Sequence, residues 1–122
     1  MQLKALEHRY AVCKLSNLSQ VSLDDSFFVL AKTDDELSLI CHTDYIPDGC
    51  EAAEDGFCGF RIAGALDFSL VGILAQLTEV LAQAGISIMA FSTYDTDYIL
   101  VREFQYQKAV EVLTAAGHQW LE

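Results

Sequence analysis

Apolar and polar positions alternate in short runs along much of the chain, and this pattern predicts strands. The runs are rich in β-branched, aromatic and aliphatic residues and are separated by polar or glycine-containing turns. They cover residues 10–16, 26–32, 37–43, 57–63, 86–92, 97–102 and 118–121. The acidic segment 44–56 contains Pro47, Gly49 and Gly56, so we expect a loop there with at most a short helical turn.

A longer period marks two helices in the second half of the chain. In the first, apolar residues recur at three- and four-residue spacing on one face: Leu70, Ile73, Leu74, Leu77, Val80, Leu81 and Ala84. Asp67 or Ser69 can cap the start of this helix, and Gly85 is a natural left-handed stop. The second helix is predicted over residues 105–116 and ends at Gly117.

From residue 57 onward the predicted order is βαββαβ, the ferredoxin-like unit of an α+β fold, in which two helices cover one face of an antiparallel sheet. A faint repeat accompanies it, because residues 32–40 align with residues 92–100. Both segments are strand-turn-strand, with Thr at the start of the turn and Asp two residues later. We therefore expect a truncated subdomain over 1–56 and a complete one over 57–122, forming one compact unit.

Composition narrows the class of protein. The chain has 122 residues, 52% of them hydrophobic, and a single proline, so it can bury a core and has no linker. No apolar run approaches the roughly 18 residues that a membrane span needs. Residues 1–10 are too charged for a secretory signal, so we expect a cytoplasmic protein. With 18 acidic and seven basic residues, the net charge of −11 argues against nucleic acid and anionic membranes as partners.

The four cysteines are expected to be reduced. A disulfide framework would need an oxidising compartment, and a zinc site would usually include a Cys-x-x-Cys pair, which the sequence lacks. Cys13 and Cys41 lie in strand-like apolar runs and are expected to be buried as small hydrophobic residues, and Cys50 and Cys58 are grouped with them.

Three runs in residues 64–101 resemble the ACT family of small-molecule-binding regulatory domains: LDFSLVGIL (66–74), LAQAGISI (81–88) and STYDTDYILV (92–101). The last run is the most specific, and the second is common to ACT domains in general. The sequence is most similar to a branch of short bacterial tandem ACT-like proteins related to cellular arginine sensors. The resemblance implies two ACT-like units side by side, the first of them degenerate, with helices on one face of antiparallel sheets.

The resemblance also implies a ligand site where a strand-to-helix loop faces a neighbouring ACT unit. Carried over to this chain, the ligand-binding residues are Asp67, Ser69, Leu70, Val71, Gly72, Ile73, Thr93, Tyr94, Thr96 and Asp97. Backbone N–H groups at a helix N-terminus suit a carboxylate, and Asp97 could accept a hydrogen bond from an ammonium or guanidinium group. A structural interpretation stays open: caps at Asp67 and Ser69, close packing at Gly72, shaping of the hairpin by Asp95 and Asp97, and core or interface aromatics at Tyr94 and Tyr98.

Patterns for chemistry are missing. The sequence has no nucleophile-elbow, metalloprotease or phosphate-loop motif, and His8, His42 and His118 are scattered surface or strand histidines. Cys41 and His42 are adjacent in a strand and therefore point to opposite faces. We expect no enzyme activity, no cofactor and no metal.

The sequence therefore predicts a non-catalytic regulatory module that binds a small molecule, with an amino acid as the expected ligand. It is expected to form a homodimer through sheet edges or helix faces and to act on a protein partner. The alternative is a structural or protein-interaction module that keeps the fold without a ligand. A third, weaker alternative is an enzyme subunit whose catalytic part lies on another chain.

Overall fold

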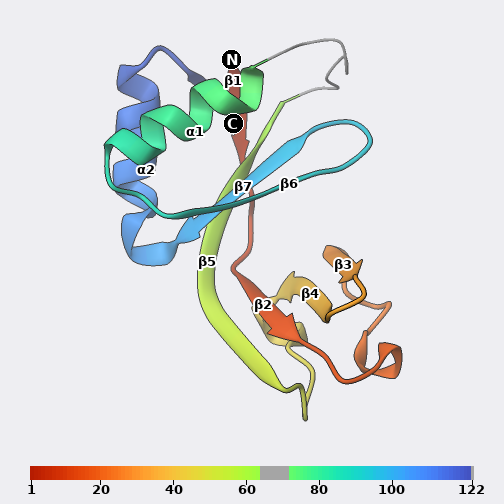
Figure 1. Cartoon of the computed structure of the whole chain (residues 1–122). Coiled ribbons are helices and arrows are strands. Elements are labelled where there is room, and N and C mark those ends of the chain that lie inside the picture. The colour runs from red at the N-terminus through yellow and green to blue at the C-terminus, as the bar shows by residue number, and fades with distance from the viewer. Residues whose placement is uncertain (64–71, 122) are drawn as a thin grey trace. The chain divides into compact units, whose positions relative to one another are not determined.

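The computed structural model, drawn in Figure 1, describes residues 1–63 and 72–121. The chain divides into two units: unit 1 comprises Met1–Glu7 and Cys58–Glu122, and unit 2 comprises His8–Phe57. Strand β5 (Ala52–Ile62) contributes its first half to unit 2 and its second half to unit 1. Each unit has its own hydrophobic core.

Unit 1 is the predicted ferredoxin-like fold with one additional strand. Its sheet has the order β6-β7-β5-β1-β8. The bounds of the four strands that join β5 are Gln2–Ala5 for β1, Ile88–Ser92 for β6, Asp97–Arg102 for β7 and Gln119–Leu121 for β8. Strand β1 lies between β5 and β8, and it is antiparallel to β5 and parallel to β8. It was not predicted, because a four-residue strand with one large apolar side chain, Leu3, gives almost no periodic signal.

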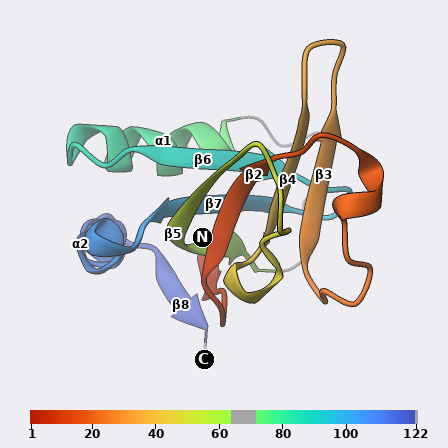
Figure 2. The same ribbon diagram turned by 90° about the horizontal axis from the view of Figure 1, so that it is seen from below.

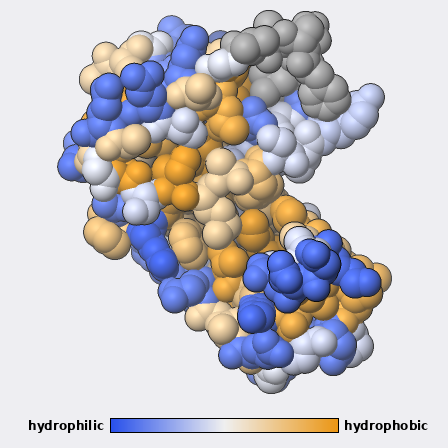
Figure 3. Space-filling model, viewed as in Figure 1, coloured by the Kyte–Doolittle hydropathy of each residue, from blue (hydrophilic) through white to orange (hydrophobic). Residues whose placement is uncertain are grey.

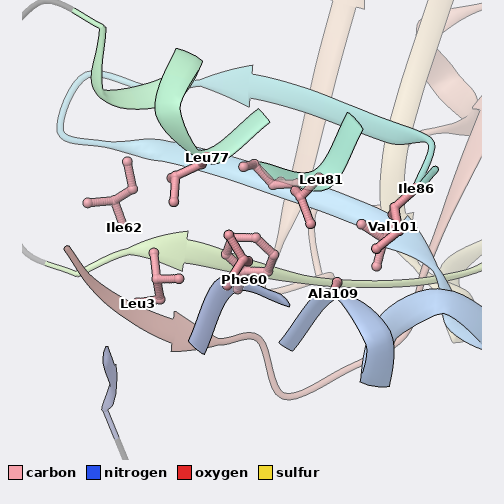
Figure 4. Close-up of a cluster of buried hydrophobic side chains, with 10 residues drawn as sticks. Leu3, Phe60, Ile62, Leu77, Leu81, Ile86, Val101 and Ala109 are labelled. Atoms are coloured by element: carbon pink, nitrogen blue, oxygen red, sulfur yellow. The ribbon is translucent and has the colours of Figure 1, made fainter. Parts of the chain in front are cut away.

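Helices α1 (Ile73–Gln83) and α2 (Glu103–Ala115) supply the rest of the unit 1 core. Leu77 and Leu81 of α1 face Phe60 of β5, and Ala109 of α2 lies against the same cluster (Figure 4). On the face drawn in Figure 3, hydrophilic side chains predominate over the outer sides of the two helices. Both helices are thus amphipathic, as their periodicity predicts.

The two helices end in the same way, at glycines with positive φ. Gly85 (φ 74°) and Gly117 (φ 99°) follow the last helical turns, as predicted. The next residue in each case donates its N–H back into the helix: Ile86 to Leu81 O at 3.0 Å and His118 to Leu113 O at 3.1 Å. This is the Schellman motif. It explains why β6 begins at Ile88 rather than at the predicted residue 86, because Ile86 is held by the cap.

The start of α1 differs from the prediction at Gly72, which was expected inside the helix. The helix begins at Ile73, with Gly72 at the N-cap position. The predicted caps, Asp67 and Ser69, and the predicted helical residue Leu70 lie outside the described residues. Helix α2 begins at Glu103, two residues before the predicted start.

Unit 2 is a four-stranded antiparallel sheet in the order β3-β4-β2-β5. Its other strands are β2 (Tyr10–Lys14), β3 (Phe28–Lys32) and β4 (Leu37–His42). Figure 2 shows β3 and β4 side by side as a hairpin. Two short 3-10 helices, η1 (Leu18–Gln20) and η2 (Thr43–Tyr45), stand where a ferredoxin-like unit has α-helices. The buried residues of its core are Ala11, Cys13, Leu15, Leu39 and Cys41.

The predicted loop over 44–56 is wrong in its last part, because β5 already begins at Ala52. Residues 52–54 pair with β2 although their side chains are exposed, so they carry no hydrophobic pattern. The ladder shifts register between Tyr10 and Val12, which places Asp55 and Gly56 in a bulge where Gly56 has φ 87°. Gly56 therefore bends a strand rather than ending a loop.

Candidate functional site

The β6–β7 hairpin is fixed to the end of β5 by Thr96. The Thr96 side chain is buried, and its hydroxyl donates a hydrogen bond of 2.8 Å to the carbonyl of Ile62. Within the turn, Thr93 donates its backbone N–H to Thr96 O at 2.9 Å and its hydroxyl to the same oxygen at 3.3 Å. Both predicted threonines therefore shape the hairpin, and Thr96 places it beside the strand end that leads into residues 64–71.

Of the predicted site residues at this hairpin, Asp97 is half-buried and Tyr94 is exposed. The Asp97 carboxylate accepts a hydrogen bond from the Ser92 hydroxyl, its partner across the ladder. A carboxylate has about four lone-pair positions, so acceptor capacity is left after this bond. Tyr94 is 84% exposed, which rules out the core interpretation for its side chain. Tyr98, by contrast, stacks on Phe91 with ring centroids 5.0 Å apart.

The N-terminus of α1 lacks a side-chain cap among the described residues. Gly72 has φ 80° and is exposed, and the first helical hydrogen bond runs from Gln76 N–H to Gly72 O at 3.0 Å. No acidic residue lies in the first turn of α1, whereas α2 has Glu103 there. The backbone N–H groups of this turn and the positive end of the helix dipole are therefore without a protein anion in the described part of the chain.

Gly72 is required for its conformation rather than for close packing. A Cβ at this position would meet no described atom within 4 Å. Its positive φ is a region that residues with a Cβ rarely adopt. The close-packing interpretation of Gly72 is therefore not supported. Its neighbour Ile73 is half-buried and packs against the unit 1 core.

Arg61 is a cation next to the Thr96 hydrogen bond that the sequence did not indicate. Its Nη1 donates to Ile62 O at 3.3 Å, the same carbonyl that accepts from Thr96. Two features of the sequence could have indicated it: Arg61 is one of only seven basic residues, and it lies near the end of the predicted strand 57–63, before the loop that carries Asp67 and Ser69. The remaining predicted site residues, Asp67, Ser69, Leu70 and Val71, lie outside the described residues.

Unit 2 contains a buried polar pair that the sequence did not indicate. His42 Nδ1 lies 2.6 Å from Asp25 Oδ1, and the His42 backbone N–H donates to Asp25 Oδ2 at 3.1 Å. Asp25 Oδ1 also accepts from Phe27 N–H at 3.0 Å. The His42 ring lies among those of His8, Tyr10, Phe27 and Tyr45. The pair connects the segment before β3 to the end of β4, so we assign it a role in stability rather than in ligand binding.

Cys41 and His42 point to opposite faces, as predicted, with Cys41 in the core cluster and His42 in the aromatic one. Burial raises the pKa of the Cys41 thiol to about 12 and also raises the pKa of Cys13. Both are buried, as predicted. Within residues 1–63 and 72–121, no three His, Cys, Asp or Glu side chains form a group that could hold a metal ion. None of the described helices is long and apolar enough to cross a membrane.

Comparison with known proteins agrees with this fold. A family model described as an ACT domain matches residues 52–115, just over half of the chain, and a model of an N-terminal domain matches residues 8–49. No curated protein matches the chain. A solved protein from Agrobacterium tumefaciens is 32% identical, with a TM-score of 0.86 over 98% of this chain and 91% of that one.

More distant structures share the fold. The regulatory subunit of aspartate kinase from Thermus thermophilus has a TM-score of 0.62 at 10% identity, over 90% of this chain and 93% of that one. Aspartate kinase from Clostridium acetobutylicum has a TM-score of 0.66 at 16% identity, but the match covers 93% of this chain and only 33% of that enzyme. ACT domains are in general regulatory modules that bind small molecules. The chain belongs to the ACT-domain family.

Proposed function

We propose that this chain is a regulatory module that binds a free amino acid between the N-terminus of α1 and the β6–β7 hairpin. The observation that carries the proposal is the N-terminus of α1, which receives no side-chain cap from residues 1–63 and 72–121 and has no acidic residue in its first turn. Helix ends of this kind bind carboxylates through backbone N–H groups. The hydrogen bond from Thr96 to Ile62 O holds the β6–β7 hairpin at the end of β5, the strand that precedes residues 64–71 and α1.

The two ends of the site have opposite polarity, which matches a zwitterion. The N–H groups that follow Gly72 would bind the carboxylate, and Asp97 would accept from the ammonium group. Asp67, Ser69, Leu70 and Val71 complete the proposed loop. The net charge of −11 disfavours an acidic amino acid, because long-range repulsion lowers the local concentration of anions. A neutral or basic amino acid is therefore the proposed ligand.

The proposed assembly is a homodimer in which a neighbouring ACT-like unit faces the loop between β5 and α1. A protein partner is proposed to bind differently when the ligand is present. Strands β6 and β8 of unit 1 and β3 of unit 2 lie at sheet edges, where pairing between chains is possible. We also propose that unit 2 descends from a second, truncated ACT-like copy. In support, Thr33 donates its N–H to Glu36 O at 2.9 Å, as Thr93 does to Thr96 O, and Lys32–Leu37 pair as Ser92–Asp97 do.

The test begins with a thermal-shift screen of the full chain against the twenty amino acids at millimolar concentration. A ligand at 100 times its Kd should add about 2.7 kcal/mol of stability and raise Tm by several degrees. Calorimetric titration then compares the amino acid with its carboxyl amide. Loss of the carboxylate should weaken binding by about tenfold or more, since hydrogen bonds to charged groups are worth about 1.5–3 kcal/mol. Light scattering with and without the ligand measures the assembly.

Asp97→Asn tests the other end of the site, with Asp95→Asn as the matched control in the same turn. We expect Asp97→Asn to weaken binding by about tenfold or more and Asp95→Asn to leave it within about twofold, because only Asp97 is proposed to touch the ammonium group. If no amino acid changes Tm, the proposal fails and the protein-interaction module becomes the better explanation. Equal effects of the two variants would remove Asp97 from the site.

A further inference from the structure

Three thiols converge within the core of unit 2. Cys13 on β2 and Cys41 on β4 are each 1% exposed, and Cys50 in the segment before β5 is half-buried against the same cluster. In the sheet, β2 lies between β4, which carries Cys41, and β5, which begins two residues after Cys50, so Cys13 is on the strand between the other two thiols. The fourth cysteine, Cys58, is in unit 1 and is half-buried.

The backbone distinguishes the two neighbours of Cys13 as disulfide partners. In the β2–β4 ladder, Cys13 is opposite Leu39 and Ala11 is opposite Cys41, so the two cysteines are diagonal neighbours. Diagonal positions lie about 7–8 Å apart, whereas a disulfide needs a Cα separation below about 7 Å. Cys13 and Cys41 are held at this spacing by the ladder on both sides, so a bond between them would distort the sheet.

Cys50 is free of that constraint. It follows Gly49 (φ 77°), and its N–H makes only a long bond of 3.4 Å to Pro47 O. The pairing with β2 starts one residue later, where Glu51 N–H donates to Lys14 O at 2.8 Å. Cys50 is therefore next to an anchored residue but is itself in a turn that can adjust.

The accessibility of the three thiols decides which of them reacts first with an oxidant. Burial shields Cys13 and Cys41 from reagents, and it raises the pKa of both thiols, so they stay protonated near neutral pH. Since the thiolate is the attacking species, neither reacts first. Cys50 reaches the surface of the unit, so an incoming oxidant meets this thiol before the other two.

We propose that Cys50 is a redox-modification site that reacts with low-molecular-weight disulfides and then forms a reversible disulfide with Cys13. The Cys50 thiolate attacks one sulfur of the reagent disulfide and releases one reagent thiolate. Cys13 gives its proton to that thiolate and attacks the Cys50 sulfur, which releases a second reagent thiolate that takes the proton lost from Cys50. Two protein thiols are oxidised, and one reagent disulfide is reduced to two thiols.

The bond would join β2 to the start of β5 and enclose the β3–β4 hairpin in a covalent loop. Such a loop restricts the unfolded chain and stabilises the folded one, and the stabilisation is lost on reduction. The proposal does not depend on a ligand in unit 1, so it can fail or succeed independently of amino acid binding.

The experiment incubates the reduced full chain with glutathione disulfide, alkylates the remaining thiols with iodoacetamide under denaturing conditions, and maps the peptides by mass spectrometry. The expected product links Cys13 to Cys50, leaves Cys41 alkylated, and disappears with dithiothreitol. The oxidised protein should have a Tm several degrees above that of the reduced protein. Cys50→Ser should abolish both the link and the shift, while the matched control Cys58→Ser should keep them.

Cys13→Ala separates the two steps. This variant should accumulate a mixed disulfide at Cys50 without an internal link, because the second thiol is missing. Three results would overturn the proposal: a link between Cys13 and Cys41, a stable mixed disulfide at Cys50 in the unmodified chain, or no loss of thiols at Cys13 and Cys50.

Discussion

Asp25 is a buried carboxylate, 5% exposed, that binds three donors of unit 2 at once: the N–H groups of Phe27 and His42 and the His42 ring. It lies in a polar stretch before β3, and polar stretches between strands are typical of exposed turns. The sequence could not indicate it, because its partner His42 is 17 residues away and the contact exists only after β3 and β4 pair.

Asp25→Ala should destabilise the protein by about 2–4 kcal/mol, because it leaves two backbone N–H groups and a buried imidazole without an acceptor. Urea denaturation measures the change. The neighbouring Asp24→Ala is the matched control, and since Asp24 is exposed, its effect should stay within about 0.5 kcal/mol. Equal effects at the two positions would mean that the Asp25 contacts contribute nothing to stability.

At the level of the element, the sequence predicts helices and hairpins better than it predicts where strands begin. Helix ends follow from local chemistry, so Gly85 and Gly117 fix them from the sequence alone. The early start of β5 depends on pairing with β2, and its exposed residues carry no apolar pattern. The hairpin part of the candidate site was likewise predictable, because the turns at Thr33 and Thr93 are local structures.

Gly59 is the point of close approach between β5 and β7. A Cβ there would lie 2.4 Å from Leu100 Cδ2 and 2.5 Å from the carbonyl oxygen of Ile99. The leucine can rotate, but the backbone oxygen cannot move without disturbing β7. Gly59→Ala should therefore destabilise the protein by about 3 kcal/mol, at the upper end for overpacking.

Urea denaturation measures the effect of Gly59→Ala as well, and Cys58→Ala on the same strand is its control. That substitution adds no atom, so the change in the free energy of unfolding should be within about 1 kcal/mol. A Gly59→Ala protein as stable as the unmodified chain would show that the strands can separate slightly at no cost.

At the level of the whole molecule, unit 1 is discontinuous in sequence, because unit 2 stands between β1 and the rest of it. Leu3 on β1 is completely buried and pairs with Ile62 on one side and Trp120 on the other. This insertion could not be predicted. A short strand whose partners are far away in sequence has no local signature, and the parallel pairing of β1 with β8 needs the complete sheet.

Leu3→Ala should destabilise unit 1 by about 3 kcal/mol through lost burial and a residual cavity. Trp120, the single tryptophan, is a built-in probe: it packs on Phe60 with ring centroids 5.2 Å apart and donates to Thr114 Oγ1 at 3.0 Å. Its fluorescence during urea denaturation follows the loss of unit 1. Gln2→Ala, at an exposed position on the same strand, should shift the curve by less than about 0.5 kcal/mol.

The placement of β1 has a consequence for how the protein is made. During translation, Leu3 leaves the ribosome early, yet its first partner, Ile62, follows only after all of unit 2, and Trp120 follows later still. Unit 2 has its strand partners within one contiguous stretch and can fold on the nascent chain. Strand β1 therefore has neither of its sheet partners until β5 has been synthesised, and the sheet of unit 1 is complete only with β8.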